Sequence, residues 1–108
     1  MIYHDRLDKI EAFTTDQNGG KVLPAKYSRE NIPCELQPQE NERTAEGVLI
    51  QAYNCFVPLD LLTDLAGKGS RIEITYRGKL LQREGGFERH VILGRFHHTE
   101  FLVEAIST

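Results

Sequence analysis

The feature that most constrains the fold of this chain is an alternation of apolar and polar residues with a period of two. In "RIEITY" (71–76), Ile72, Ile74 and Tyr76 alternate with charged or polar residues. Successive side chains of a β-strand point to opposite faces, so this pattern is typical of strands with one face in a core. The sequence therefore predicts an all-β protein.

The same alternation marks further strands along the chain. The expected strands cover residues 9–15, 32–36, 48–58, 71–84 and 88–106. The run 71–84 reverses at "RGK" and predicts a hairpin, and the run 88–106 supplies one or two closing strands. Pro24 has no backbone N–H, so the residues around it predict an edge strand or an irregular crossing. The glycines of "DQNGGK" (16–21) and "GGF" (85–87) predict turns.

One segment changes the period. In "PLDLLTDLAGKG" (58–69), Leu59, Leu62 and Leu65 recur every three residues, and Gly67 follows where a helix would end. This predicts a turn or two of helix. With six or seven strands and one short helix, we expect a small antiparallel barrel or sandwich in a single domain over residues 1–108.

A polar segment separates the strands "NIPCEL" and "VLIQAYNCFV". A tight hairpin needs about two to five linking residues, and this segment is roughly twice as long. Three glutamates against one arginine make it acidic, and it has no large apolar side chain, so we expect a long polar loop that is mobile on the free protein. A tolerated surface insertion is the alternative reading. Its residues are Gln37, Pro38, Gln39, Glu40, Asn41, Glu42, Arg43, Thr44, Ala45, Glu46 and Gly47.

Composition indicates a protein made and kept in the cytoplasm. The net charge of −3 argues against a domain whose main task is to bind nucleic-acid phosphates. No apolar run is long enough to cross a membrane, and charges occupy the N-terminus where a signal peptide needs an apolar core. Cys34 and Cys55 lie in apolar runs, which favours buried free thiols over a disulfide.

Four histidines raise the question of a metal site. His97 and His98 are neighbours, and neighbours in a strand point to opposite faces. His4 and His90 are far away in sequence, and the short spacings of zinc sites are absent. We therefore expect no metal and no cofactor.

Signals for catalysis are similarly weak. The serines lack the G-x-S-x-G context of hydrolases, and "GKGS" (67–70) has the wrong order for a phosphate-binding loop. Nothing in the acidic segment would raise the pKa of one glutamate above the others. We therefore expect a protein that is not an enzyme. A small enzyme or ligand-binding domain is kept as the last of three hypotheses, after the two that follow.

A single-stranded nucleic-acid-binding barrel, similar to an OB-fold, is the second hypothesis. Basic residues in the second half of the chain support it: Arg71, Arg77, Lys79, Arg83, Arg89 and Arg95. Tyr76, Phe87 and Phe96 lie among them, as stacking platforms would. However, Tyr76 shares the apolar face of its strand, which predicts a core position.

From Asp5 to Arg95, the order of features resembles the head-closure, or head–tail joining, proteins of tailed bacteriophages and prophages. The resembling features are an N-terminal strand with a glycine turn, "IPCELQPQENERTAEG" as strand and polar loop, the long strand ending "CFVP", and "GSRIEITYRGKLLQRE" as a glycine-led hairpin.

The resemblance implies a small β-barrel with a structural role. Copies of such a protein assemble as a ring beneath the portal, contact portal or adaptor and tail-completion proteins, and help to retain packaged DNA. The loop after the second strand projects toward the channel in that family, and the matching positions here are Gln37–Gly47. The expected location is the host cytoplasm during assembly, and the virion thereafter.

Overall fold

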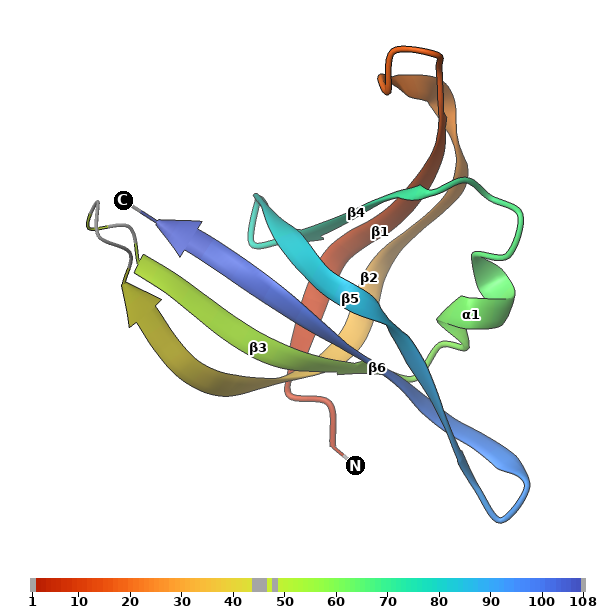
Figure 1. Cartoon of the computed structure of the whole chain (residues 1–108). Helices are drawn as coiled ribbons and strands as arrows, with labels where there is room; N and C mark the ends of the chain where they lie inside the picture. Colours follow the sequence, from red (N-terminus) through yellow and green to blue (C-terminus); the bar gives the residue numbers. More distant parts are fainter. Residues whose placement is uncertain (1, 44–46, 48, 108) are drawn as a thin grey trace.

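The computed structural model of the chain describes residues 2–43, 47 and 49–107. These residues form a closed barrel of antiparallel strands in the order β1-β2-β3-β6-β5-β4, with one short helix (Figure 1). The elements are β1 (Asp5–Thr15), β2 (Lys21–Arg43), β3 (Leu49–Val57), α1 (Leu61–Asp64), β4 (Arg71–Tyr76), β5 (Lys79–Ile92) and β6 (Arg95–Ser107). The predicted all-β barrel with one short helix is confirmed.

Two long strands close the barrel by changing partners along their length. β2 pairs with β1 as far as Cys34 and with β3 from Glu35 onward. β5 pairs first with β4 and then, from Gln82, with β6. The sequence predicts an edge strand or crossing around Pro24 that is separate from the strand at 32–36, and this division is wrong because both belong to β2. The chain bends between them at Asn31, where φ is 55°, a conformation that asparagine tolerates.

Pro24 lies in the least regular part of the β1–β2 pair. The register shifts between Ala12, which lies opposite Tyr27, and Thr14, which lies opposite Val22. The residues of β2 between these two pairs, including Pro24, have no partner in that register. Proline is tolerated in such an irregularity because it has no N–H to leave unpaired. The predicted irregular crossing is therefore confirmed.

The turns of the second half differ in part from the prediction. The hairpin at "RGK" is confirmed, since Arg77 and Gly78 connect β4 to β5 with φ of 50° and 78°. "GGF" is not a turn but a register shift inside β5, between Glu84 and Glu88. Glycines in a strand interior often mark such a bulge, which the sequence pattern does not distinguish from a turn. The β5–β6 turn falls at Leu93–Gly94 instead.

The core is made of apolar residues from all six strands and from the α1 region. Its buried members are Leu7, Ile10, Ala12, Ile32, Cys34, Cys55, Val57, Leu61, Leu65, Ile74, Leu81, Phe101 and Val103. The two cysteines are free and buried, as predicted. Thr99 is the fully buried polar residue of β6, and its hydroxyl donates to the Leu59 carbonyl and accepts from the Leu61 N–H at 3.2 Å. These bonds tie the α1 region to the barrel.

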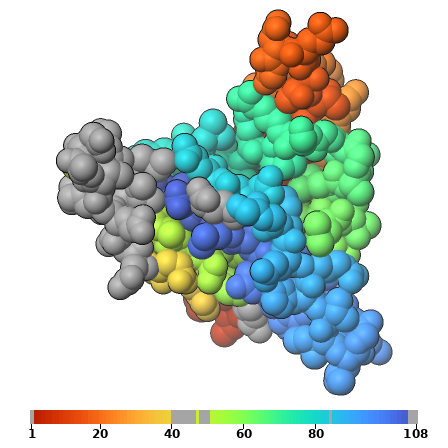
Figure 2. Space-filling model, in the orientation of Figure 1, coloured from red at the N-terminus to blue at the C-terminus, as the bar shows by residue number. Residues whose placement is uncertain are grey.

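Two hairpins project from this core at separate corners of the molecule. The β1–β2 turn, at residues 16–20, lies at the top of Figure 2, and the β5–β6 turn lies at the lower right. Figure 1 shows that β5 and β6 continue well past the end of the barrel before they meet. The projecting ends lie outside the packed core, so their side chains are exposed to solvent or to partners.

Candidate functional site

The polar segment that the sequence predicts as a mobile loop is for the most part a strand. Residues Gln37–Arg43 end β2 and pair with β3 in antiparallel register. The loop prediction over these residues is therefore wrong. Thr44–Glu46 lie outside the described residues, whereas Gly47 is described and exposed. The connection between β2 and β3 is much shorter than the sequence suggested.

The composition of this segment has a structural cause. β2 leaves β1 at Cys34, so in the described residues the segment beyond it pairs with β3 alone. Gln37, Pro38 and Gln39 are exposed, and the register shifts between Pro38 and Asn41. A strand that extends past a core needs no apolar face, and proline is tolerated at an edge or a bulge. Its polar sequence is for that reason indistinguishable from that of a loop.

The β5–β6 hairpin ends in an apolar tip, formed by Val91, Ile92 and Leu93. Leu93 is 97% exposed, and the other two are 46% and 52% exposed. Leu93 and Gly94 are the two central residues of the turn, with φ of 50° and 77°, as a type I′ turn requires. Leucine is strained in this left-handed conformation, whereas asparagine is favoured there. Leu93 is therefore both strained and almost fully exposed at the tip of a projecting hairpin.

A second apolar patch lies on the β1–β2 hairpin. It consists of Val22 and Leu23, which are 40% and 69% exposed. These residues follow directly after the projecting turn, at a different corner of the molecule from the apolar tip (Figure 2). Single exposed apolar residues are common on protein surfaces, and here they gather in two small clusters on projecting hairpins.

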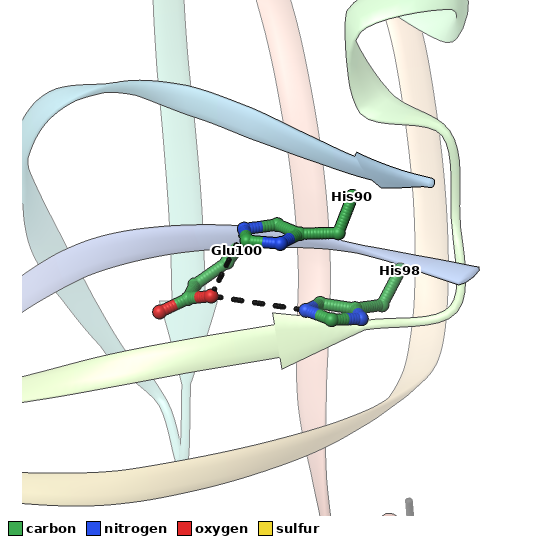
Figure 3. Close-up of side chains that lie close together, drawn as sticks. All are labelled: His90, His98 and Glu100. Atoms are coloured by element: carbon green, nitrogen blue, oxygen red, sulfur yellow. Dashed lines mark ion pairs between the residues drawn. The ribbon is translucent and has the colours of Figure 1, made fainter. Parts of the chain in front are cut away.

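Two histidines and a glutamate meet at the base of the β5–β6 hairpin (Figure 3). His90 lies directly opposite His98 in the β5–β6 register, with parallel rings whose centroids are 4.5 Å apart. Glu100 Oε2 lies 3.1 Å from His90 Nε2 and 3.7 Å from His98 Nε2. We call His90, His98 and Glu100 the histidine cluster. Figure 3 shows both rings directed toward the same carboxylate.

The structure removes two of the sequence arguments against a metal site, the distance between His90 and the other histidines and the opposite directions of His97 and His98. His90 is distant from His98 in sequence but lies beside it in the sheet. His97 is an extra residue in β6, since Val91 pairs with Phe96 while His90 pairs with His98. A bulge of this kind breaks the alternation of side chains. As a result, the Nδ1 atoms of His97 and His98 lie 2.7 Å apart instead of on opposite faces.

Burial favours the neutral form of His98. His98 is 8% exposed and packs against the Phe56 ring. Loss of water, together with the nearby His90 and His97, lowers the pKa of His98 below its usual value. A neutral imidazole keeps one nitrogen lone pair, which is the form that binds metals. Glu100 acts in the opposite direction but does not outweigh burial.

The aromatic residues proposed as stacking platforms are already in contact with other side chains. Arg83 lies over the Phe87 ring at 4.6 Å, and Arg89 lies over the Phe96 ring at 5.4 Å. Tyr76 packs against the core, as its place in the apolar alternation predicted. Stacking of bases on these rings would require the arginines to move away.

Comparisons with other proteins add no relative to these observations. No protein-family model, curated protein or solved structure matches the chain. Within the part of the chain that the structure describes, no helix has both the length and the apolar character needed to cross a lipid bilayer.

Proposed function

We propose that this chain is a structural head–tail connector, or head-closure, protein of a phage or prophage. In this proposal, copies of the chain form a ring below the portal, contact portal or adaptor and tail-completion proteins, and help to retain packaged DNA. Assembly takes place in the host cytoplasm, and the ring becomes part of the virion. The resemblance of residues 5–95 to that family suggests this role, and the two projecting apolar hairpins support it.

The observation that carries the proposal is the position of the two apolar patches. A closed ring needs a head-to-tail interface, in which one surface of a subunit contacts a different surface of the next. The apolar tip (Val91–Leu93) and the β1–β2 patch (Val22 and Leu23) are two such surfaces at separate corners. We assign the apolar tip of one subunit to the β1–β2 patch of its neighbour.

The small size of both patches agrees with assembly on a template. Stable protein–protein interfaces bury roughly 1,200–2,000 Å², far more than two or three side chains provide. The isolated chain should therefore be a monomer or a weak oligomer in dilute solution. Binding to a preformed portal raises the local concentration of subunits, which then close the ring.

The acidic segment Gln37–Gly47 is the proposed channel element. The segment carries Glu40, Glu42 and Glu46 against Arg43, so a ring of copies would present an acidic collar. Such a collar repels DNA phosphates and would not hold the genome by adhesion. Because Gln37–Arg43 are paired with β3, the collar would be built from hairpins instead of mobile loops.

The test is ring formation on the portal protein encoded by the same genome. Electron microscopy of the purified chain mixed with that portal should show an added ring. Leu93→Asn and Leu23→Thr should each reduce ring formation at least tenfold. Leu80→Ser is the control: it changes a leucine that is 63% exposed in the β4–β5 hairpin, outside the β1–β2 and β5–β6 hairpins, and it should assemble normally.

Three results would contradict the proposal. They are an absence of binding to the portal, equal loss of assembly in the Leu80 control, and normal assembly of both hairpin variants. Tight, salt-dependent binding of single-stranded oligonucleotides at physiological ionic strength would favour the nucleic-acid-binding alternative instead.

Neutralising the collar with Glu40→Gln and Glu42→Gln should leave rings intact while changing DNA retention in particles. Unchanged retention would show that these glutamates play no part in holding the packaged DNA.

A further inference from the structure

We propose that His90, His98 and Glu100 form a binding site for a divalent transition-metal ion such as Zn²⁺ on the outer face of the β5–β6 hairpin. The site is separate from the apolar tip, and its existence does not depend on the connector function. It rests on the geometry of the three side chains, on a buried nitrogen without a hydrogen bond, and on the arrangement of charges across the two strands.

The spacing of the three ligand atoms suits a tetrahedral ion. With metal–ligand bonds of about 2.1 Å, neighbouring ligand atoms of such an ion lie about 3.4 Å apart. Glu100 Oε2 lies 3.1 Å from His90 Nε2 and 3.7 Å from His98 Nε2, on either side of this value. The ligand atoms of all three residues lie within 4.8 Å of one another. The side chain of His90 is 39% exposed, so its ring has room to tilt toward an ion.

The second observation is the Nε2 atom of His98. His98 is 8% exposed, and this atom is buried. It lies 3.7 Å from Glu100 Oε2, which is too far for a hydrogen bond, and it has no hydrogen-bond partner among the described residues. A buried polar atom without a partner is unfavourable, and a bound ion or water is a common explanation. Figure 3 shows that this nitrogen is directed toward the Glu100 carboxylate, which is the position an ion would share with both groups.

His97 holds His98 in a suitable orientation. Their Nδ1 atoms lie 2.7 Å apart, so one ring donates a hydrogen bond to the other. When His98 donates, its Nε2 keeps a lone pair that faces the Glu100 carboxylate. Lone pair and carboxylate repel each other, and a cation between them changes this repulsion into two attractive bonds. Histidine ligands of metals commonly donate their other N–H in this manner, so His97 is a positioning residue.

Charges across the strands also favour a cation. Glu88 lies directly opposite Glu100, next to the pair of His90 and His98. Like charges in directly opposite positions destabilise a sheet. A divalent ion bound beside them would offset this repulsion, and Glu88 Oε2 already lies 3.4 Å from His90 Nε2. The four residues thus form an E-x-H strand paired with an H-x-E strand.

Access to the site is open from the solvent. A hollow of about 280 Å³ beside the cluster is lined in part by Glu88, Glu100 and Gly86. Gly86 belongs to the bulge in β5 and places no side chain in this hollow. Water can therefore complete the coordination of an ion held by the three protein ligands. Two imidazoles with one carboxylate select Zn²⁺, Co²⁺, Ni²⁺ or Cu²⁺ over Ca²⁺ and Mg²⁺, which prefer oxygen ligands.

The test uses the full chain without a histidine tag, freed of metals with a chelator. Isothermal titration calorimetry with Zn²⁺ should show one equivalent of ion bound per chain. The melting temperature of the protein should rise when Zn²⁺ is added and fall again when a chelator removes it. Co²⁺ should give the visible absorption of a four-coordinate N/O site, without the thiolate charge-transfer band that cysteine ligands produce. Mg²⁺ should not compete.

Variants distinguish this site from other ligands. His90→Ala and Glu100→Gln change partly exposed positions, and each should weaken Zn²⁺ binding at least tenfold while the protein remains folded. His97→Ala should weaken it by a smaller factor, as changes at positioning residues do. His4→Ala is the matched control, because His4 also pairs with a glutamate, Glu35, at 2.7 Å. The control should bind Zn²⁺ like the unchanged chain.

Two outcomes would overturn the proposal. One is an absence of Zn²⁺ binding by the folded chain at micromolar concentrations. The other is binding that does not depend on the proposed ligands, shown either by its persistence in both His90→Ala and Glu100→Gln or by its loss in His4→Ala. A cysteine site would also be revealed by the Co²⁺ spectrum. The hydrogen bond with Cys34, followed by burial, raises the pKa of Cys55, which favours its protonated thiol.

Discussion

Replacing Leu93 with asparagine should make the isolated protein more stable and its assembly weaker. Leu93 occupies the first central position of the β5–β6 turn with a φ of 50°, followed by Gly94 at 77°. The left-handed conformation costs an ordinary L-residue about 1–2 kcal/mol. Asparagine tolerates it, and Asn-Gly is the preferred pair for a type I′ turn.

The expected gain follows from what the leucine contributes in the free protein. Leu93 is 97% exposed, so its removal loses almost no buried apolar surface. If asparagine recovers half or more of the strain, the free energy of unfolding rises by about 1 kcal/mol. In a chain of this size, that change raises the melting temperature by about 4 °C.

Thermal unfolding followed by circular dichroism measures the change, and Arg77→Asn is a matched control. Arg77 has the same φ of 50° and is also followed by a glycine, in the β4–β5 turn. Its gain should be smaller, because its guanidinium lies over the Tyr76 ring at 5.2 Å. The control should not affect assembly. A lower melting temperature for Leu93→Asn would refute the argument, since it would mean that Leu93 stabilises the free chain.

Two further predictions concern the barrel itself. Gly69→Ala should destabilise the protein by about 3 kcal/mol or more, as measured by chemical denaturation, because φ of Gly69 is 109° and an added Cβ would lie 2.1 Å from the Phe13 carbonyl oxygen. Gly67→Ala is the control. Gly67 has a φ of 72° and open space around it, so this change should cost only about 1 kcal/mol. Burial, followed by the hydrogen bond to Asp5, raises the pKa of Tyr76 to about 12 from 10.0, so its stabilising contribution should be complete below pH 10 and lost as pH rises toward 12. Tyr76→Phe should abolish this loss of stability at high pH. It should also remove the tyrosine ionisation at the highest pH from a phenolate absorbance titration, and an unchanged titration would contradict the assignment of that ionisation to Tyr76.

The strands with one face in the core were predictable from the sequence. In β4, Ile72, Ile74 and Tyr76 alternate cleanly, and the "RGK" reversal placed the next turn correctly. The pattern failed where strands extend beyond the core. Gln37–Arg43 contain no large apolar residue although they pair with β3, so composition alone cannot separate this part of the strand from a loop. Glycines within β5 likewise look the same in a bulge as in a turn.

The histidine cluster could not be predicted because it depends on pairing between strands. His90 lies opposite His98 only because β5 continues through its bulge to Ile92. A turn at "GGF" would place these residues in a different register. The contact between His97 and His98 requires a second bulge, which overrides the alternation that any sequence pattern assumes. The apolar tip had a weak signal in the sequence, the run "VILG", in which three apolar residues precede a glycine.

The most direct test of the connector account is electron microscopy of the purified chain bound to the portal of the same genome. We expect a monomer or weak oligomer in free solution and a ring on the portal. In that ring, the apolar tip of each copy should contact Val22 and Leu23 of the next copy. A chain that never binds the portal would contradict the account, and so would a ring in which the β5–β6 turns face solvent.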